Sequence, residues 1–119
     1  TGIVVLAIDY NSRVGVDIEE ISPRILRVRE KFLSDEELIL IPEDDLRMHT
    51  IAWTAKEALF KAIPESGIDF AQDLHLNFPI GKEFTASESR SDKARLYNLL
   101  TIDNNTDYIT TIATEQNKK

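Results

Sequence analysis

The stretch from about Asp45 to Ile63 constrains the fold most, because it predicts one long helix with a single apolar side. At about 100° per residue, the apolar side chains gather on one broad arc. The arc consists of Ile51, Ala52, Ala55, Ala58, Leu59, Ala62 and Ile63. Thr54, Glu57 and Lys61 are expected on the opposite side, where Glu57 can form an ion pair with Lys61. The helix therefore needs a second layer that covers its apolar arc.

The residues before this helix predict a hairpin and two short helices. Gly2–Ile8 is a short apolar run, and Val14–Glu19 is a second candidate strand beyond a turn-forming stretch. A Ser-Pro pair is typical of a helix start and predicts a helix over about 22–32. Ser34 with Glu37 three residues later forms a capping-box pattern, which predicts the start of a second short helix.

The residues after the long helix predict strands. Polar and apolar residues alternate over Leu74–Phe78, Ala94–Ile102 and Tyr108–Thr114. Ala86–Lys93 is polar and is expected to form a mobile loop. This order of elements predicts an α+β fold in which an antiparallel sheet packs against helices, within a single domain of residues 1–119.

Composition and charge exclude several classes of function. The net charge of −7 argues against general affinity for nucleic acids or anionic membranes, which need a basic surface. No apolar run approaches the roughly 20 residues that span a bilayer. The chain has no cysteine, which fits a reducing compartment, so a cytoplasmic location is expected. Its first residue is Thr1 and not Met, as expected for a piece of a longer protein.

Lys56 is an exception to the separation of apolar and polar residues on the two sides of the long helix. It projects between Phe60 and Ile63, at the margin of the apolar arc. Burying an ammonium group without a partner is costly, so Lys56 either extends along the helix to reach water or meets an anion. The helix alone leaves both readings open.

Asp17 and Glu19 form the second notable pattern. On a strand, residues two apart face the same side, so the two Cα atoms are expected roughly 6.6 Å apart. Neighbouring carboxylates repel each other unless a cation lies between them, and Mg²⁺ prefers oxygen ligands of this kind. The same Asp-x-Glu pattern also occurs by chance on solvent-facing strands.

The two patterns together are more specific than either alone. VGVDIEE followed by WTAKEALFK resembles the 4′-phosphopantetheinyl transferase family, whose signatures are G-(I/V)-D-x-E and (W/F)-(S/T/A)-x-K-E-(A/S)-x-x-K. The matching positions are Gly15, Asp17, Glu19, Trp53, Lys56, Glu57, Ala58 and Lys61. The resemblance covers about Gly2 to Ile63, and the remainder agrees with the family only in general character.

The resemblance implies a transferase of the holo-[acyl-carrier-protein] synthase type. Coenzyme A would be the substrate, Mg²⁺ the cofactor, a serine of an apo acyl or peptidyl carrier protein the acceptor, and 3′,5′-ADP the product. Asp17, Glu19 and Glu57 would hold the metal, directly or through water. Glu57 would also take the serine proton, while Lys56 and Lys61 would face the phosphates of coenzyme A. Trp53 is expected to pack.

A local basic patch lies between the two signatures. Arg24, Arg27 and Lys31 are spaced by three and four residues and could share one helix face. Since carrier proteins of this family are acidic, the patch is a candidate docking surface. The alternative is an ordinary solvated helix face.

The family also implies that one copy of this chain lacks part of its site. Short members assemble as trimers, whereas longer members contain two similar halves, and this chain resembles the second half of the longer type. Either a homo-oligomer or a missing N-terminal half would complete the site. Two rival readings remain: a non-catalytic half that retains the metal ligands, and an unrelated Mg²⁺-dependent phosphotransferase or phosphatase.

Overall fold

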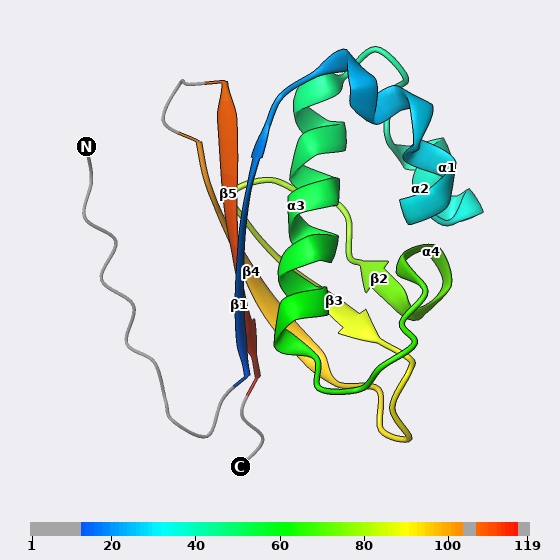
Figure 1. Ribbon diagram of the computed structural model, residues 1–119, viewed down its shortest axis with the longest axis vertical. Helices are drawn as coiled ribbons and strands as arrows, with labels where there is room; N and C mark the ends of the chain where they lie inside the picture. Colours follow the sequence, from blue (N-terminus) through cyan, green and yellow to red (C-terminus); the bar gives the residue numbers. More distant parts are fainter. Residues whose placement is uncertain (1–12, 104–106, 117–119) are drawn as a thin grey trace.

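A five-stranded antiparallel sheet forms one layer of the protein, and the helices cover one of its faces (Figure 1). The computed structural model describes residues 13–103 and 107–116. The strand order is β1-β5-β4-β3-β2. The strands are β1 (Val14–Glu20), β2 (Leu74–Leu76), β3 (Glu83–Glu88), β4 (Leu96–Ile102) and β5 (Tyr108–Glu115). The predicted α+β fold class is confirmed.

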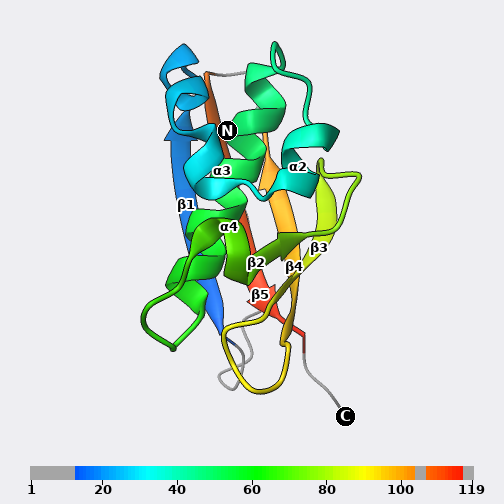
Figure 2. The ribbon, with the colours of Figure 1, turned by 90° about the vertical axis from the view of Figure 1, so that its right-hand side faces the viewer.

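The long helix lies along the sheet, and the shorter helices lie on the side of it that faces away from the sheet (Figure 1). The helices are the 3-10 helix η1 (Pro23–Arg27), α1 (Arg29–Phe32), α2 (Asp35–Leu40), α3 (Leu46–Ala62) and α4 (Phe70–Asp73). In the turned view, α4 lies in front of the long helix (Figure 2). The predicted long helix is α3, with Asp45 as its N-cap. The capping box of Ser34 and Glu37 is also confirmed at the start of α2. No helix among the described residues has the length and apolar character needed to cross a membrane.

α3 is enclosed on more sides than its single apolar arc predicts. Ala52, Ala55 and Ala58 are fully buried, and these small side chains let the sheet approach the helix closely. Thr54, expected on the exposed side, is also fully buried, so that expectation is wrong. Its hydroxyl donates to backbone carbonyls of the preceding turn and contacts the Thr111 hydroxyl at 2.8 Å. The helix lies between the sheet on one side and η1 and α1 on another.

Gly15 shows how closely β1 and α3 approach each other. A Cβ atom at this position would lie 1.9 Å from the carbonyl oxygen of Ala58 and 2.9 Å from the backbone nitrogen of Ala62. No side chain fits in that space. Gly15 therefore serves a close approach of strand and helix, which the sequence could not separate from a role in a hairpin turn.

Two predicted segments differ from the structure. The helix expected over 22–32 is interrupted at Val28, whose backbone leaves the helical region and separates η1 from α1. The loop expected over Ala86–Lys93 is wrong for its first residues, which belong to β3. β3 pairs with β2 and β4, so its polar sequence forms a strand through its neighbours. The hairpin partner Gly2–Ile8 lies outside the described residues, and β1 pairs with β5.

Replacing Gly15 with alanine is expected to destabilise the protein by about 3 kcal/mol or more, at the upper end of overpacking costs, because the clash is with helix backbone. Urea denaturation measures this loss. Gly81→Ala is the matched control: a Cβ there meets nothing within 4 Å, so a change within about 0.5 kcal/mol is expected. Equal midpoints for the two variants would contradict the packing argument.

Candidate active site

Asp17 points from β1 toward α3. It stands two residues after Gly15 on the same side of the strand, and only 7% of its surface is exposed. The ammonium group of Lys61 donates to Asp17 Oδ1 at 2.8 Å and to the backbone oxygen of Val16 at 3.1 Å. Two segments far apart in the sequence thus meet through an ion pair. The sequence predicts Glu57 as the partner of Lys61, whereas Lys61 forms its salt bridge with Asp17.

Glu19 and Glu57 belong to the same electrostatic cluster. Burial raises the pKa of Glu19 to about 7, and the adjacent Asp17 and the charge of Glu57 add to the rise. The side chain of Trp53 favours the charged form of Glu19 and opposes this rise in pKa. Burial and then Asp17 also raise the pKa of Glu57, while Lys61 lowers it. The charges of the three acids named from the sequence therefore influence one another.

One atom of this cluster lacks a donor. Asp17 Oδ2 is buried and has no hydrogen-bond partner among the described residues. A divalent cation would satisfy this oxygen.

The donor set fits Mg²⁺ in chemistry but is not already arranged around one point. Asp17, Glu19 and Glu57 provide oxygen ligands of the kind that Mg²⁺ prefers. Within residues 13–103 and 107–116, no three His, Cys, Asp or Glu side chains form a preassembled metal group. Instead of a cation shared by the acids, the ammonium group of Lys61 forms an ion pair with the Asp17 carboxylate. The metal role of the three acids stays a prediction.

Lys56 lies elsewhere. Its ammonium group is fully buried and bonds to Glu37 Oε1 at 2.6 Å and to the backbone oxygens of Phe70 and Leu74, each at 2.8 Å. The anion that the sequence left unnamed is Glu37. In this arrangement, Lys56 has no proton left to donate to a phosphate.

Two shallow grooves that the sequence did not reveal flank the acids. One, of about 360 Å³, is lined by Glu19, Glu20, Ser22, Arg24, Ile25, Val28 and Trp53. The other, of about 390 Å³, is lined by Val28, Lys31, Phe32, Trp53 and Phe70. Trp53 and Val28 line both grooves. The conspicuous Trp of WTAKEALFK was a signal for this surface, whereas nothing in the sequence singled out Phe70.

Arg24, Arg27 and Lys31 do not share one regular helix. Arg24 and Arg27 lie three residues apart on η1, where a 3-10 helix places such residues on one side. Lys31 is on α1 and lines the second groove, whereas Arg24 lines the first. The basic residues therefore border two adjacent hollows.

Comparison with protein families identifies the superfamily to which the chain belongs. The family profile of the 4′-phosphopantetheinyl transferase superfamily matches residues 13–113, a span that contains the acids, both lysines, strands β1 to β4 and most of β5. The chain belongs to this superfamily of transferases. Among curated proteins, none matches the chain at a significant level.

Replacing Glu19 with glutamine is expected to raise the melting temperature at about pH 8 when divalent cations are absent. Since the pKa of Glu19 is raised, the folded protein holds this proton more tightly than the unfolded chain, and ionisation costs stability. The gain should be largest above pH 7 and vanish below pH 4.5. Thermal melts across pH measure it, with exposed Glu20→Gln as the control. An equal or lower melting temperature for Glu19→Gln at pH 8 would contradict the proposed repulsion.

Proposed function

We propose that this chain transfers the 4′-phosphopantetheine arm of coenzyme A to a serine of an apo acyl or peptidyl carrier protein. The observation that carries the proposal is the ion pair between Asp17 and Lys61, with Glu19 and Glu57 coupled to the same aspartate. This ion pair links β1 to α3, which supports a common site for the acids and Lys61. Membership of the superfamily supports the reaction class.

The three acids would hold Mg²⁺, which when bound supplies positive charge next to the pyrophosphate of coenzyme A. Lys61 is about half exposed and bonds to Asp17 and Val16, so its ammonium group can turn toward an incoming phosphate. Positive charge placed there stabilises the negative charge that develops as the phosphoryl group is transferred. Lys61 is therefore the phosphate ligand that we propose from this chain.

Glu57 is the proposed general base. The carrier serine oxygen forms a bond to the β-phosphorus of coenzyme A, and 3′,5′-ADP leaves with the bridging oxygen. The serine proton passes to Glu57, directly or through a water molecule. Burial and the charge of Asp17 raise the pKa of Glu57, which makes its carboxylate a better proton acceptor near neutral pH.

The grooves beside Glu19 are the proposed docking surface for the carrier protein. Arg24 and Lys31 supply positive charge at their edges, and Ile25 and Val28 supply apolar contact. A carrier protein with an acidic surface complements these residues. Its serine would then be delivered next to the acid cluster.

The transfer is tested by incubating the chain with Mg²⁺, coenzyme A and an apo carrier protein, and then weighing the carrier. A mass gain of ~340 Da corresponds to the phosphopantetheine arm. Asp17→Asn and Glu57→Gln are each expected to abolish the gain, because they remove metal ligands and, at Glu57, the base. Glu83→Gln, at an exposed acid of β3, serves as the matched control and should retain it. Full transfer by both site variants would refute the assigned roles.

A second candidate is a non-catalytic half that binds without turnover. It is favoured by the exposed apolar side chains of β1, a strand at one end of the described order: Val16 and Ile18 are 46% and 60% exposed. Such a half would pair with a missing N-terminal half or with further copies. Binding of coenzyme A in calorimetry without any mass gain on the carrier would identify this alternative.

Reversing charge on η1 tests the docking surface. The double variant Arg24→Glu/Arg27→Glu is expected to raise the KM for the carrier protein at least roughly ten-fold, because like charges now meet across the interface. The KM for coenzyme A should stay unchanged. Lys93→Glu, in the loop between β3 and β4, is the matched control and should alter neither constant. An unchanged carrier KM in the double variant would end this proposal.

A further inference from the structure

The buried ammonium group of Lys56 joins three elements that the chain contributes separately. It leaves α3, pairs with Glu37 of α2, and donates to the carbonyl oxygens of Phe70 in α4 and of Leu74 at the start of β2. An ammonium group has three protons, and each has an acceptor within 2.8 Å. Burial lowers the pKa of Lys56, and Glu37 opposes the change by favouring the charged form.

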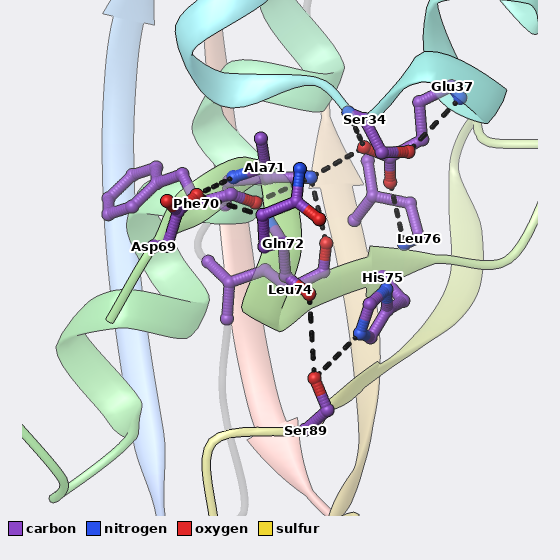
Figure 3. A network of polar contacts seen from close by, with 11 residues as sticks. Ser34, Glu37, Asp69, Phe70, Ala71, Gln72, Leu74, His75, Leu76 and Ser89 are labelled. Atoms are coloured by element: carbon purple, nitrogen blue, oxygen red, sulfur yellow. Dashed lines mark hydrogen bonds and ion pairs between the residues drawn. The ribbon is translucent and has the colours of Figure 1, made fainter. Parts of the chain in front are cut away.

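The carboxylate oxygens of Glu37 accept hydrogen bonds from backbone at the start of α2 and in β2. Its Oε1 accepts the backbone N–H of Ser34 at 2.9 Å, which closes the capping box of α2, and its Oε2 accepts the backbone N–H of Leu76 at 3.0 Å. Figure 3 shows Glu37 between Ser34 and Leu76, with Phe70 and Leu74 on the neighbouring segment. Every charge of the pair is therefore tied to backbone in α2, α4 or β2. Loss of either partner leaves the other buried and unpaired.

Phe70, whose carbonyl oxygen accepts from Lys56, forms one wall of the second groove. The ring of Phe70 lies 5.8 Å from that of Trp53 and 5.3 Å from that of Phe60. Trp53 in turn packs against Phe32 at 5.0 Å and lines the first groove together with Glu19. A line of contacts thus runs from Lys56 through Phe70 to Trp53, in the groove that Glu19 also lines.

We propose that Lys56 is a positioning residue that holds α4 and Phe70 against Trp53, and that it does not bind the phosphates of coenzyme A. This inference rests on the proposed function only for its activity measurements. The resemblance in the motif implied the opposite role. The two roles differ in what Glu37 should do: a phosphate ligand does not depend on Glu37, whereas a positioning lysine acts through it.

A double-mutant cycle separates the two roles. Lys56→Gln alone leaves the Glu37 carboxylate buried without its cation, so we expect a melting temperature at least 8 °C lower and a loss in kcat/KM of roughly 100-fold, as for misplaced site groups. Adding Glu37→Gln removes the unpaired charge and should recover at least roughly ten-fold of that loss, together with part of the melting temperature. Lys82→Gln, at an exposed lysine, is the matched control.

The fluorescence of Trp53 can report a displacement of Phe70 without an activity measurement. It is the only tryptophan of the chain, so its fluorescence arises at the groove. Lys56→Gln is expected to shift its emission to longer wavelength as Phe70 moves away, and the double variant should reverse the shift. A wild-type melting temperature and emission in Lys56→Gln, or a double variant as inactive as the single one, would overturn the proposal.

The wild-type protein provides a test that does not depend on how the variants fold. Nitrogen-15 spectra of the lysine ammonium groups are recorded while coenzyme A and Mg²⁺ are added. We expect the Lys61 signal to shift and the Lys56 signal to stay in place. Equal shifts of both signals would overturn the inference. If coenzyme A causes no shift at all, the proposed function fails, and the stability cycle and Trp53 emission still decide the role of Lys56.

Discussion

The contact between Gly15 and the backbone of α3 determines how the rest of the site is built. Without a Cβ, β1 can lie directly against the turn of Ala58 and Ala62. Asp17, two residues further along the same side of the strand, is then carried against the helix and buried at the level of Lys61. A wider separation would leave Asp17 in water and its partner out of reach. Gly15 thus affects the site because it allows a short distance between β1 and α3, and not because its backbone is flexible.

Close approach also explains the electrostatic character of the acids. Burial is the largest cause of the raised pKa of Glu19 and of Glu57, and the interaction of each with Asp17 comes second. A cluster of this kind costs stability when it is ionised and empty of cations. Lys61 offsets part of that cost from the solvent side. The same features that weaken the metal-free protein favour a bound cation, since its charge removes the repulsion.

The sequence predicted the elements that local chemistry specifies. The capping box of Ser34 and Glu37, the extent of α3, and the shared face of Asp17 and Glu19 each follow from a few neighbouring residues. The interruption at Val28 and the strand β3 could not be predicted, because they depend on packing and pairing with distant segments. Thr54 was misplaced for a related reason: periodicity identifies one buried arc, whereas α3 is covered on more than one side.

The different fates of the two motif lysines follow from helix geometry. Lys56 and Lys61 are five residues apart, so on a regular helix their side chains point about 140° apart. Glu57 and Lys61, four apart, are separated by only about 40°. A ligand that Lys61 and Glu57 share is therefore on the wrong side for Lys56, whose direction leads into the protein toward Glu37. The periodicity that set Lys56 at the margin of the apolar arc already separated it from Lys61, but the acid that pairs with it comes from α2, and only the folded chain shows that partner.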